Sequence, residues 1–283
     1  MHNNIVCFCI NIYFIIQSLH ERKSSMVVRR IRFFGKHYLK GDNSKEGYLI
    51  DKKQTLEQRT FAETEGIIRL LDLKGEERIL DVPSGYGRHS IALAKKGFNV
   101  TGIELNAIHL NEAIRNAETA QVTPNFVKGN MIDISHKEEF DAVINVFYSF
   151  GFFETDEENK RVLENFFNVL KKGGKLLFHT DVNVPRILAG KYKEDETRNL
   201  ASGDILRIID KYNLTDKRVH GTWIIKNKDG KEEKKYYSVR IYTREEFIDL
   251  CKQVGFTSFE VYSDWNKTPY SEDSEDMIII AKK

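Results

Sequence analysis

Two acidic residues and two glycines stand close together in residues 79–106, ILDVPSGYGRHSIALAKKGFNVTGIELN. Asp81 ends a short apolar run, Gly85 and Gly87 follow it, and Glu104 ends the next apolar run. Glycines behind a strand let the backbone approach a ligand with no Cβ in the way. A carboxylate at the end of the second strand can accept hydrogen bonds from both hydroxyls of a ribose. The segment therefore predicts a site for a ligand that carries a nucleoside.

Glycine loops of this kind also bind dinucleotides, and three details separate the two possibilities. The dinucleotide fingerprint G-x-G-x-x-G is incomplete, because Ser90 stands at the third glycine position. Asp81 would repel a pyrophosphate but suits the cationic amino group of a methionine moiety. The segment 129–133 (GNMID) follows the third expected strand, where an adenine would lie. The pattern favours an adenosine joined to methionine, and a nicotinamide-dependent oxidoreductase stays the alternative.

The chain is long enough for one α/β domain with an insertion, since it has 283 residues, 41% hydrophobic and 30% charged. Its net charge of +2 gives no bias toward nucleic acid or a membrane surface. The three cysteines, Cys7, Cys9 and Cys251, lack metal-binding spacing and indicate a reduced compartment. We expect a cytoplasmic monomer or homodimer, with no nucleic-acid or membrane partner and with Cys251 in the core.

Strands and helices alternate through the middle of the chain. Short apolar runs predict strands at 78–82, 99–104, 125–128, 141–147 and 176–181, the last after a turn at 171–175. Helices are expected at 55–72 (Phe61, Thr64, Ile68 and Leu71 inward), at 88–96, after Asn106 (Leu110, Ala113, Ile114 and Ala117 inward) and at 156–170 (Leu163, Phe166, Phe167 and Leu170 inward). This alternation predicts an α/β fold whose doubly wound, mostly parallel seven-stranded sheet has helices on both faces.

The rhythm changes after residue 185. Extended segments at 205–212, 219–226 and 234–242 predict a small antiparallel β insertion. A helix at 243–254, capped by Thr243, and strands at 256–262 and 277–281 complete the sheet. We therefore divide the chain into an N-terminal extension (1–25), a flap and helix (26–75), a core that binds the cofactor (76–184), a lid insertion (185–240) and a C-terminal part of the core (241–283).

An apolar run at 5–16 is 12 residues long, whereas a membrane-spanning helix needs about 20. No Lys or Arg precedes the run, as a signal peptide would require. Three interpretations stay open. The segment is an upstream sequence with Met26 as the true start, an anchor on a membrane surface, or an extension that is disordered or packed on the domain.

These motifs resemble the class I S-adenosylmethionine-dependent methyltransferase family, over roughly residues 60–262. The resemblance rests on the acid before the glycine loop, the acid that ends the second strand, the loop 129–133, and the segments FDAVINVFYSFGFF, LKKGGKLLF and TREEFIDLCKQVGF. It implies S-adenosylmethionine as cofactor, with Asp81, Gly85 and Gly87 at the methionine end and Glu104 on the ribose. It also implies that Met131 packs on the adenine and that Asp133 or a neighbouring backbone group meets the adenine amino group. Pro83, Leu105, Asn130 and Asn145 complete the expected lining. The chain departs from the family where Pro83 replaces the usual first glycine and Asn130 replaces a common aspartate.

Transfer of an activated methyl group mainly requires alignment and exclusion of water, and a base only if the nucleophile arrives protonated. Ligands of a doubly wound sheet lie beyond the carboxyl ends of its strands. Candidates there are Tyr148, Ser149, His179, Asp181 and Asn183, with His89 near the glycine loop. Each also has a structural explanation as a packing or loop-fixing residue. No set of residues has the spacing of a metal site, and no metal is expected.

The acceptor is expected to be a small molecule that is methylated on nitrogen or oxygen. The stretch after the fourth strand (NVFY) lacks the prolines of many enzymes that methylate nucleic-acid amino groups. The insertion resembles an antiparallel lid, for which Tyr212, Trp223, Tyr236, Tyr237 and Tyr242 would supply an aromatic lining. The alternatives are an RNA or protein methyltransferase, a nicotinamide-dependent oxidoreductase, and a binding protein that kept the fold and lost the reaction.

Overall fold

A computed structural model of the chain describes residues 56–200 and 203–283. The expectations for the apolar run 5–16, for Met26 as a start and for a flap at 26–55 concern residues outside these ranges. Within these ranges, no helix is both long and apolar enough to cross a membrane.

A seven-stranded sheet forms the centre of the molecule, with the strand order β10-β11-β5-β4-β1-β2-β3. Its strands are β1 (Arg78–Asp81), β2 (Asn99–Glu104), β3 (Asn125–Lys128), β4 (Phe140–Asn145), β5 (Leu170–Thr180), β10 (Ser258–Tyr262) and β11 (Met277–Lys282). All neighbours pair in parallel except β11, which is antiparallel to both β5 and β10. The predicted fold is confirmed. The strand order reverses on either side of β1, which is where such sheets bind ligands.

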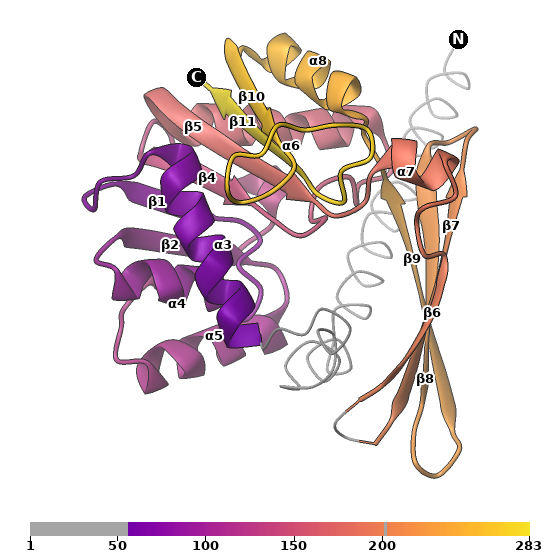
Figure 1. Ribbon diagram of the computed structural model, residues 1–283. Coiled ribbons are helices and arrows are strands. Elements are labelled where there is room, and N and C mark those ends of the chain that lie inside the picture. The colour runs from indigo at the N-terminus through magenta and orange to yellow at the C-terminus, as the bar shows by residue number, and fades with distance from the viewer. Residues whose placement is uncertain (1–55, 201–202) are drawn as a thin grey trace, which may run out of the picture.

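Helices cover both faces of this sheet (Figure 1). They are α3 (Leu56–Leu71), α4 (Arg88–Lys95), α5 (Ala107–Thr119), α6 (Asp156–Val169) and α8 (Arg244–Val254), with a 3-10 turn at Met131–Asp133. One hydrophobic cluster joins α3 and α4 to β1, β4, β5 and β11, and a second joins α6 and α8 to the opposite face. Cys251 lies in the second cluster and is fully buried, as expected.

The inward faces of three helices differ in part from those expected. Phe61 of α3 is 63% exposed and Ile68 is half-buried, whereas Ile67 and Leu70 are buried. Ile114 of α5 is 40% exposed, whereas His109 is buried. On α6, Phe167 is half-buried and Leu170 already belongs to β5. The sequence period allows several adjacent stripes, and packing on the sheet selects one of them.

The turn expected at 171–175 lies inside a strand. β5 runs from Leu170 to Thr180, and its pairing with β4 shifts register between Phe140 and Ala142. Gly173 has a φ of 80°, a backbone conformation that favours glycine. The two glycines therefore make an irregularity within β5 instead of a turn before it.

The insertion is a separate four-stranded antiparallel sheet of β6 (Asp195–Asn199), β7 (Ile205–Asn213), β8 (Arg218–Lys226) and β9 (Glu232–Arg240). The last three strands were expected. β6 and the short helix α7 (Val184–Leu188) were not, because DETRN is polar and VPRIL is too short to show a period. Valines at 182, 184, 219 and 239 join the base of this sheet to the end of β5. The sheet then extends away from the helices (Figure 1).

Candidate active site

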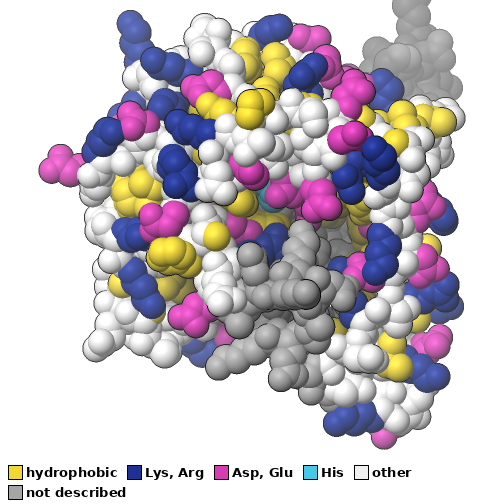
Figure 2. All heavy atoms as spheres, viewed as in Figure 1, with side chains coloured by type: hydrophobic (Ala, Val, Ile, Leu, Met, Phe, Trp, Pro, Cys, Tyr) yellow, Lys and Arg dark blue, Asp and Glu magenta, His cyan; other side chains and the backbone are white. Residues whose placement is uncertain are grey.

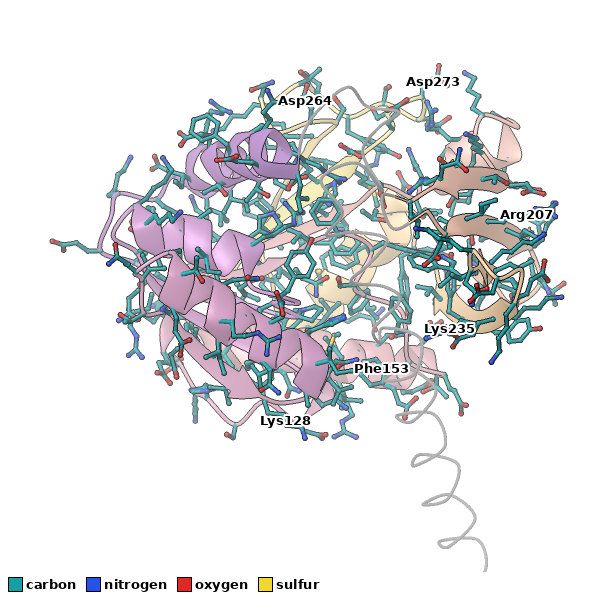
Figure 3. The ribbon with its side chains drawn as sticks, turned by 90° about the horizontal axis from the view of Figure 1, so that it is seen from below. Lys128, Phe153, Arg207, Lys235, Asp264 and Asp273 are labelled. Carbon is teal, nitrogen blue, oxygen red and sulfur yellow. The ribbon has the colours of Figure 1, made fainter. Side chains whose placement is uncertain are left out.

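A cavity of about 920 Å³ lies beyond the carboxyl ends of β1, β2 and β4 and reaches the inner face of the antiparallel sheet. Figure 3 shows the two parts that enclose it, with Lys128 on β3 in one part and Arg207 and Lys235 on the antiparallel sheet in the other. Figure 2 shows acidic side chains gathered near the centre of the face where the two parts meet. The cavity is therefore bounded by both the parallel sheet and the insertion.

The loop between β1 and α4 forms one wall. Gly85 has a φ of 57°, and a Cβ there would meet no atom within 4 Å, so the backbone borders open space. The buried Ser84 hydroxyl beside it has no hydrogen-bond partner among the described residues. Gly87 has a different role, because a Cβ there would lie 2.6 Å from the ring of Phe126. Gly87 lets α4 and β3 approach each other and does not line the cavity.

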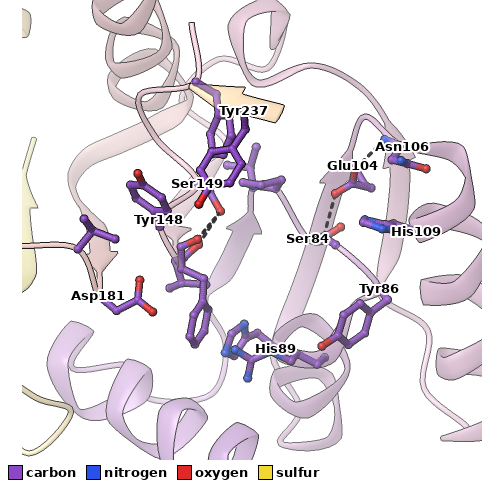
Figure 4. Close-up of a pocket in the computed structure, with 18 of the residues that line it drawn as sticks. Ser84, Tyr86, His89, Glu104, Asn106, His109, Tyr148, Ser149, Asp181 and Tyr237 are labelled. Atoms are coloured by element: carbon purple, nitrogen blue, oxygen red, sulfur yellow. Dashed lines mark hydrogen bonds between the residues drawn. The ribbon is translucent and has the colours of Figure 1, made fainter. Parts of the chain in front are cut away.

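Glu104 lies on the cavity at the end of β2, and its side chain is fixed from two directions. Its Oε2 accepts a hydrogen bond from the Gly85 amide at 2.9 Å, and its Oε1 accepts one from the Asn106 amide at 2.7 Å (Figure 4). Burial raises the pKa of this carboxyl, although the backbone amides oppose the shift. Each oxygen keeps a further lone pair for a ligand hydroxyl. Leu105 and the half-buried Asn130 and Met131 also line this end.

Besides Gly87, three of the expected cofactor residues lie outside the cavity lining. Asp81 is 1% exposed and accepts a hydrogen bond from the Ser90 hydroxyl at 2.6 Å, and burial raises its pKa to about 7. Asn145 is equally buried and donates to the Val82 carbonyl at 2.7 Å. Asp81 ends β1 and Asn145 ends β4, and their side chains bond to groups of α4 and of the glycine loop, respectively. Asp133 is exposed, and its carboxylate lies 3.9 Å from Arg161, so its side chain does not reach the cavity.

A cluster of charged and aromatic side chains lies beside the glycine loop. The buried Glu63 of α3 forms ion pairs with Arg59 and Arg88 and contacts His89 at 3.0 Å. Both guanidinium groups lie over the ring of Phe147, 4.2 and 4.4 Å from its centre, and the ring stacks on His89. Burial lowers the pKa of His89 to about 4, so the ring is neutral at pH 7. This geometry agrees with the loop-fixing interpretation of His89 and makes it a poor base.

Two other candidates are held away from the cavity by their own partners. His179 is 1% exposed, and its Nδ1 accepts a hydrogen bond from the Phe147 amide at 3.2 Å. The buried Asn183 binds the Ser274 carbonyl at 2.9 Å and the Tyr270 hydroxyl at 2.9 Å. Neither residue lines the cavity. The hydrogen bonds of His179 and Asn183 agree with the structural interpretation of these two residues.

Tyr148, Ser149 and Asp181 do line the cavity, on the side opposite Glu104 (Figure 4). The Ser149 hydroxyl is used locally, because it donates to the Val146 carbonyl at 2.7 Å. The Tyr148 hydroxyl is buried and has no hydrogen-bond partner in the described part of the chain. The two residues Phe147 and Tyr148 have φ values of 59° and 54°, which are strained for non-glycine residues.

The antiparallel sheet supplies fewer of the expected aromatic residues than the sequence suggested. Trp223 and Tyr237 line the cavity as expected. The other three do not: Tyr236 is 68% exposed, Tyr242 is buried in the core, and Tyr212 packs at the base of the sheet. Strand alternation explains the difference between positions 236 and 237, since neighbours point to opposite faces.

Sequence reasoning missed several residues that line the cavity. Arg59 and Arg88 look like ordinary solvated helix residues, and Tyr192 and Asp210 lie in a segment without a recognisable motif. The Asp210 carboxylate accepts hydrogen bonds from the hydroxyls of Tyr192, at 2.9 Å, and Tyr237. The alternation of β7 alone would have placed Asp210 on the same face as Ile208.

Comparison with known proteins identifies the core. Residues 79–174 match the family model of the methyltransferase domain. The chain is 27% identical over 228 residues to the glycine/sarcosine N-methyltransferase of Aphanothece halophytica, covering 80% of this chain and 83% of that protein. It is 32% identical over 128 residues to a tRNA (uracil(54)-C(5))-methyltransferase of Pyrococcus abyssi, covering 45% of this chain and 31% of that protein.

Solved structures show the same fold. An S-adenosylmethionine-dependent methyltransferase from Clostridium acetobutylicum aligns with a TM-score of 0.68 and 16% identity, covering 83% of this chain and 94% of that one. An amino pentose methyltransferase from Micromonospora echinaspora, solved with its S-adenosylmethionine, aligns with a TM-score of 0.60 and 18% identity, covering 82% of this chain and 93% of that one. Residues 79–174 thus form a methyltransferase domain, and the chain is an S-adenosylmethionine-dependent methyltransferase with the class I fold.

Proposed function

We propose that this enzyme transfers a methyl group to a nitrogen or oxygen atom of a small molecule, which binds between the parallel sheet and the antiparallel lid. One observation carries the proposal. A single cavity connects Gly85 and Glu104 at one end to Tyr148, Trp223 and Tyr237 at the other. Walls on both sides orient an acceptor and exclude water, which are the two contributions that this reaction most needs.

The cavity end beside β2 fits S-adenosylmethionine. Gly85 opens onto free space, the Ser84 hydroxyl lacks a partner among the described residues, and Glu104 presents two oxygens. The residues proposed to hold the cofactor directly are Pro83, Gly85, Glu104, Leu105, Asn130 and Met131, with Asp81, Gly87, Asn145 and the backbone near Asp133 supporting them from behind. When bound, the cofactor supplies an activated methyl group whose bond to sulfur breaks as the acceptor attacks.

Three observations favour a small acceptor over RNA. The sequence match to the tRNA methyltransferase covers 45% of this chain and 31% of that protein. The basic side chains that line the cavity each have an acidic partner, so they present no stripe of free positive charge. The relative from Aphanothece halophytica is named for small amines and matches a larger part of the chain, 80%. Binding of RNA that weakens steeply with salt would favour the alternative.

Calorimetry with S-adenosylhomocysteine tests the cofactor site. Glu104→Gln keeps the volume of the side chain but replaces a charged acceptor, and each charge-assisted hydrogen bond contributes about 1.5–3 kcal/mol. We expect binding at least tenfold weaker than in the wild type. Glu118→Gln makes the same chemical change at an exposed position on α5. It is the control, and this variant should bind S-adenosylhomocysteine normally. Equal affinity of Glu104→Gln and wild type, or preferential binding of NADH, would contradict the assignment.

A further inference from the structure

We infer that the acceptor is a cationic amine, held by Asp181 and by the group of Asp210, Tyr192 and Tyr237 at the lid end of the cavity. This inference rests on the proposed transfer to a small molecule and names the class of that molecule. The acceptor nitrogen would lie near Tyr148, between the end of β5 and the inner face of the antiparallel sheet.

The cavity lining carries an imbalance of charge. Each basic side chain there has an acidic partner: Arg186 lies 3.7 Å from Glu275, Lys191 lies 2.5 Å from Asp273, and Lys193 and Arg198 share Glu196. At the other end, Arg59 and Arg88 share Glu63.

Two acids at the lid end of the cavity lack such compensation. The half-buried Asp181 side chain has neither an ion pair nor a hydrogen bond within residues 56–200 and 203–283. Asp210 is 6% exposed and has only tyrosine hydroxyls as side-chain partners in the same ranges. Buried carboxylates are unfavourable unless they are paired, and a ligand cation would pair with both.

Asp210 belongs to a group of side chains that three adjacent strands hold together. Asp210, Gly221 and Tyr237 stand side by side on three adjacent strands. Gly221 has no side chain, so the Tyr237 ring lies across β8 and its hydroxyl reaches Asp210. The hydroxyls of Tyr192 and Tyr237 donate to the two oxygens of the Asp210 carboxylate, so its described side-chain partners are neutral groups. The negative charge of Asp210 is therefore not balanced by a described cation, and an ammonium donor would supply one.

The buried Tyr148 hydroxyl has no hydrogen-bond partner within the described ranges. Burial raises the pKa of Tyr148 well above its usual value, and the nearby Asp210 and Asp181 add to the rise. The phenol stays neutral and has two lone pairs and one hydrogen for a ligand. The rings of Trp223 and Tyr237 also line this end, and aromatic faces attract cations.

The chemistry of the transfer agrees with this lining. An ammonium group must first lose one proton to water, because a protonated nitrogen has no lone pair. The nitrogen lone pair then forms the bond to the methyl carbon while the carbon–sulfur bond breaks, and its electrons stay on sulfur. Positive charge thus moves from sulfur to nitrogen, and fixed carboxylates stabilise it there. An anionic oxygen nucleophile would instead be repelled by the same carboxylates.

Binding of matched ligands to the protein saturated with S-adenosylhomocysteine tests this inference. The probes are 2-phenylethylamine, 2-phenylethanol and N-acetyl-2-phenylethylamine, followed by glucosamine, glucose and N-acetylglucosamine, with calorimetry as the readout. We expect at least one amine to bind ten times more tightly than both of its neutral counterparts. Asp181→Asn should weaken that binding about tenfold or more, and Tyr237→Phe should weaken it less, while both variants keep the affinity for S-adenosylhomocysteine.

Asp195→Asn is the control. This substitution removes the same charge from an exposed position on β6 that does not line the cavity. Neutral counterparts that bind as well as the amines, an absence of amine binding in both series, or an Asp181→Asn variant that binds the amine normally would each overturn the inference. Failure of the proposed function is a separate result, since the protein would then not bind S-adenosylhomocysteine at all.

Discussion

The glycine at position 221 gives a direct test of how the acceptor end is built. A Cβ on Gly221 would overlap the ring of Tyr237, so Gly221→Ala must displace that ring. The displaced hydroxyl then loses its hydrogen bond to Asp210. A hydrogen bond to a charged group contributes about 1.5–3 kcal/mol, and overpacking adds about 1–3 kcal/mol. We therefore expect Gly221→Ala to lower the free energy of unfolding by several kcal/mol.

A double-mutant cycle separates the two contributions. In a Tyr237→Phe background the ring is still displaced, but the hydroxyl is already gone, so only the overpacking cost remains. Urea unfolding followed by tryptophan fluorescence should give a coupling energy of about 1.5–3 kcal/mol between the two substitutions. Binding of S-adenosylhomocysteine should change less than twofold in every variant, since position 221 lies on the lid. Equal costs of Gly221→Ala in both backgrounds would refute the reasoning.

Three further predictions concern other parts of the molecule. The folded pKa of His89, about 4, lies below its ordinary value of 6.5, so the unfolded chain takes the proton first as the pH falls. The contribution of this residue to the free energy of unfolding is complete above pH 6.5 and is lost toward pH 4. In urea unfolding, the free energy of unfolding of the wild type should therefore fall by about 2 kcal/mol more than that of His89→Gln between pH 7.5 and 5. A smaller loss would show that the ring is not buried as a neutral group. Trp223 lines the cavity, so Trp223→Ala should raise the KM for the acceptor at least tenfold. Tyr236 is 68% exposed, so Tyr236→Ala should leave this KM unchanged. Similar effects of the two substitutions would contradict the assignment of the two residues to opposite faces of the antiparallel sheet. Burial raises the pKa of the Cys251 thiol, so mass spectrometry should find no alkylation of Cys251 by iodoacetamide until the protein unfolds; rapid native labelling would place this helix face in solvent.

Much of the parallel sheet could be predicted because its strands are short apolar runs separated by helices with clear caps. Asn106 caps α5 through a hydrogen bond from the Ile108 amide, and Thr243 and Glu246 form the capping box of α8. These signals are local, since the residues that make them lie within a few positions of each other. The register of β5 could not be predicted, because its irregularity at Gly173 depends on pairing with β4.

The cofactor end was easier to predict than the acceptor end for the same reason. Glu104 and Gly85 belong to one continuous motif, and the structure joins them by a hydrogen bond. Asp181 and Asp210 are brought together only by the docking of two sheets, and no spacing in the sequence encodes this. Residue type alone could not place His179 and Asn183 outside the cavity lining, because buried polar side chains that hold the backbone look like catalytic ones in a sequence.

The strained pair Phe147 and Tyr148 links the two ends of the cavity mechanically. Both backbone amides are bonded to one residue, since the Phe147 amide meets Nδ1 of His179 and the Tyr148 amide meets its carbonyl oxygen. The Phe147 ring lies beside the arginines near the glycine loop, and the Tyr148 ring packs against the hydrophobic cluster at the base of the lid. A ligand that displaced one ring would strain the backbone that carries the other, and any resulting change in affinity is reciprocal by thermodynamic necessity. We expect cofactor and acceptor to bind with heterotropic cooperativity, transmitted through a hinge of two residues.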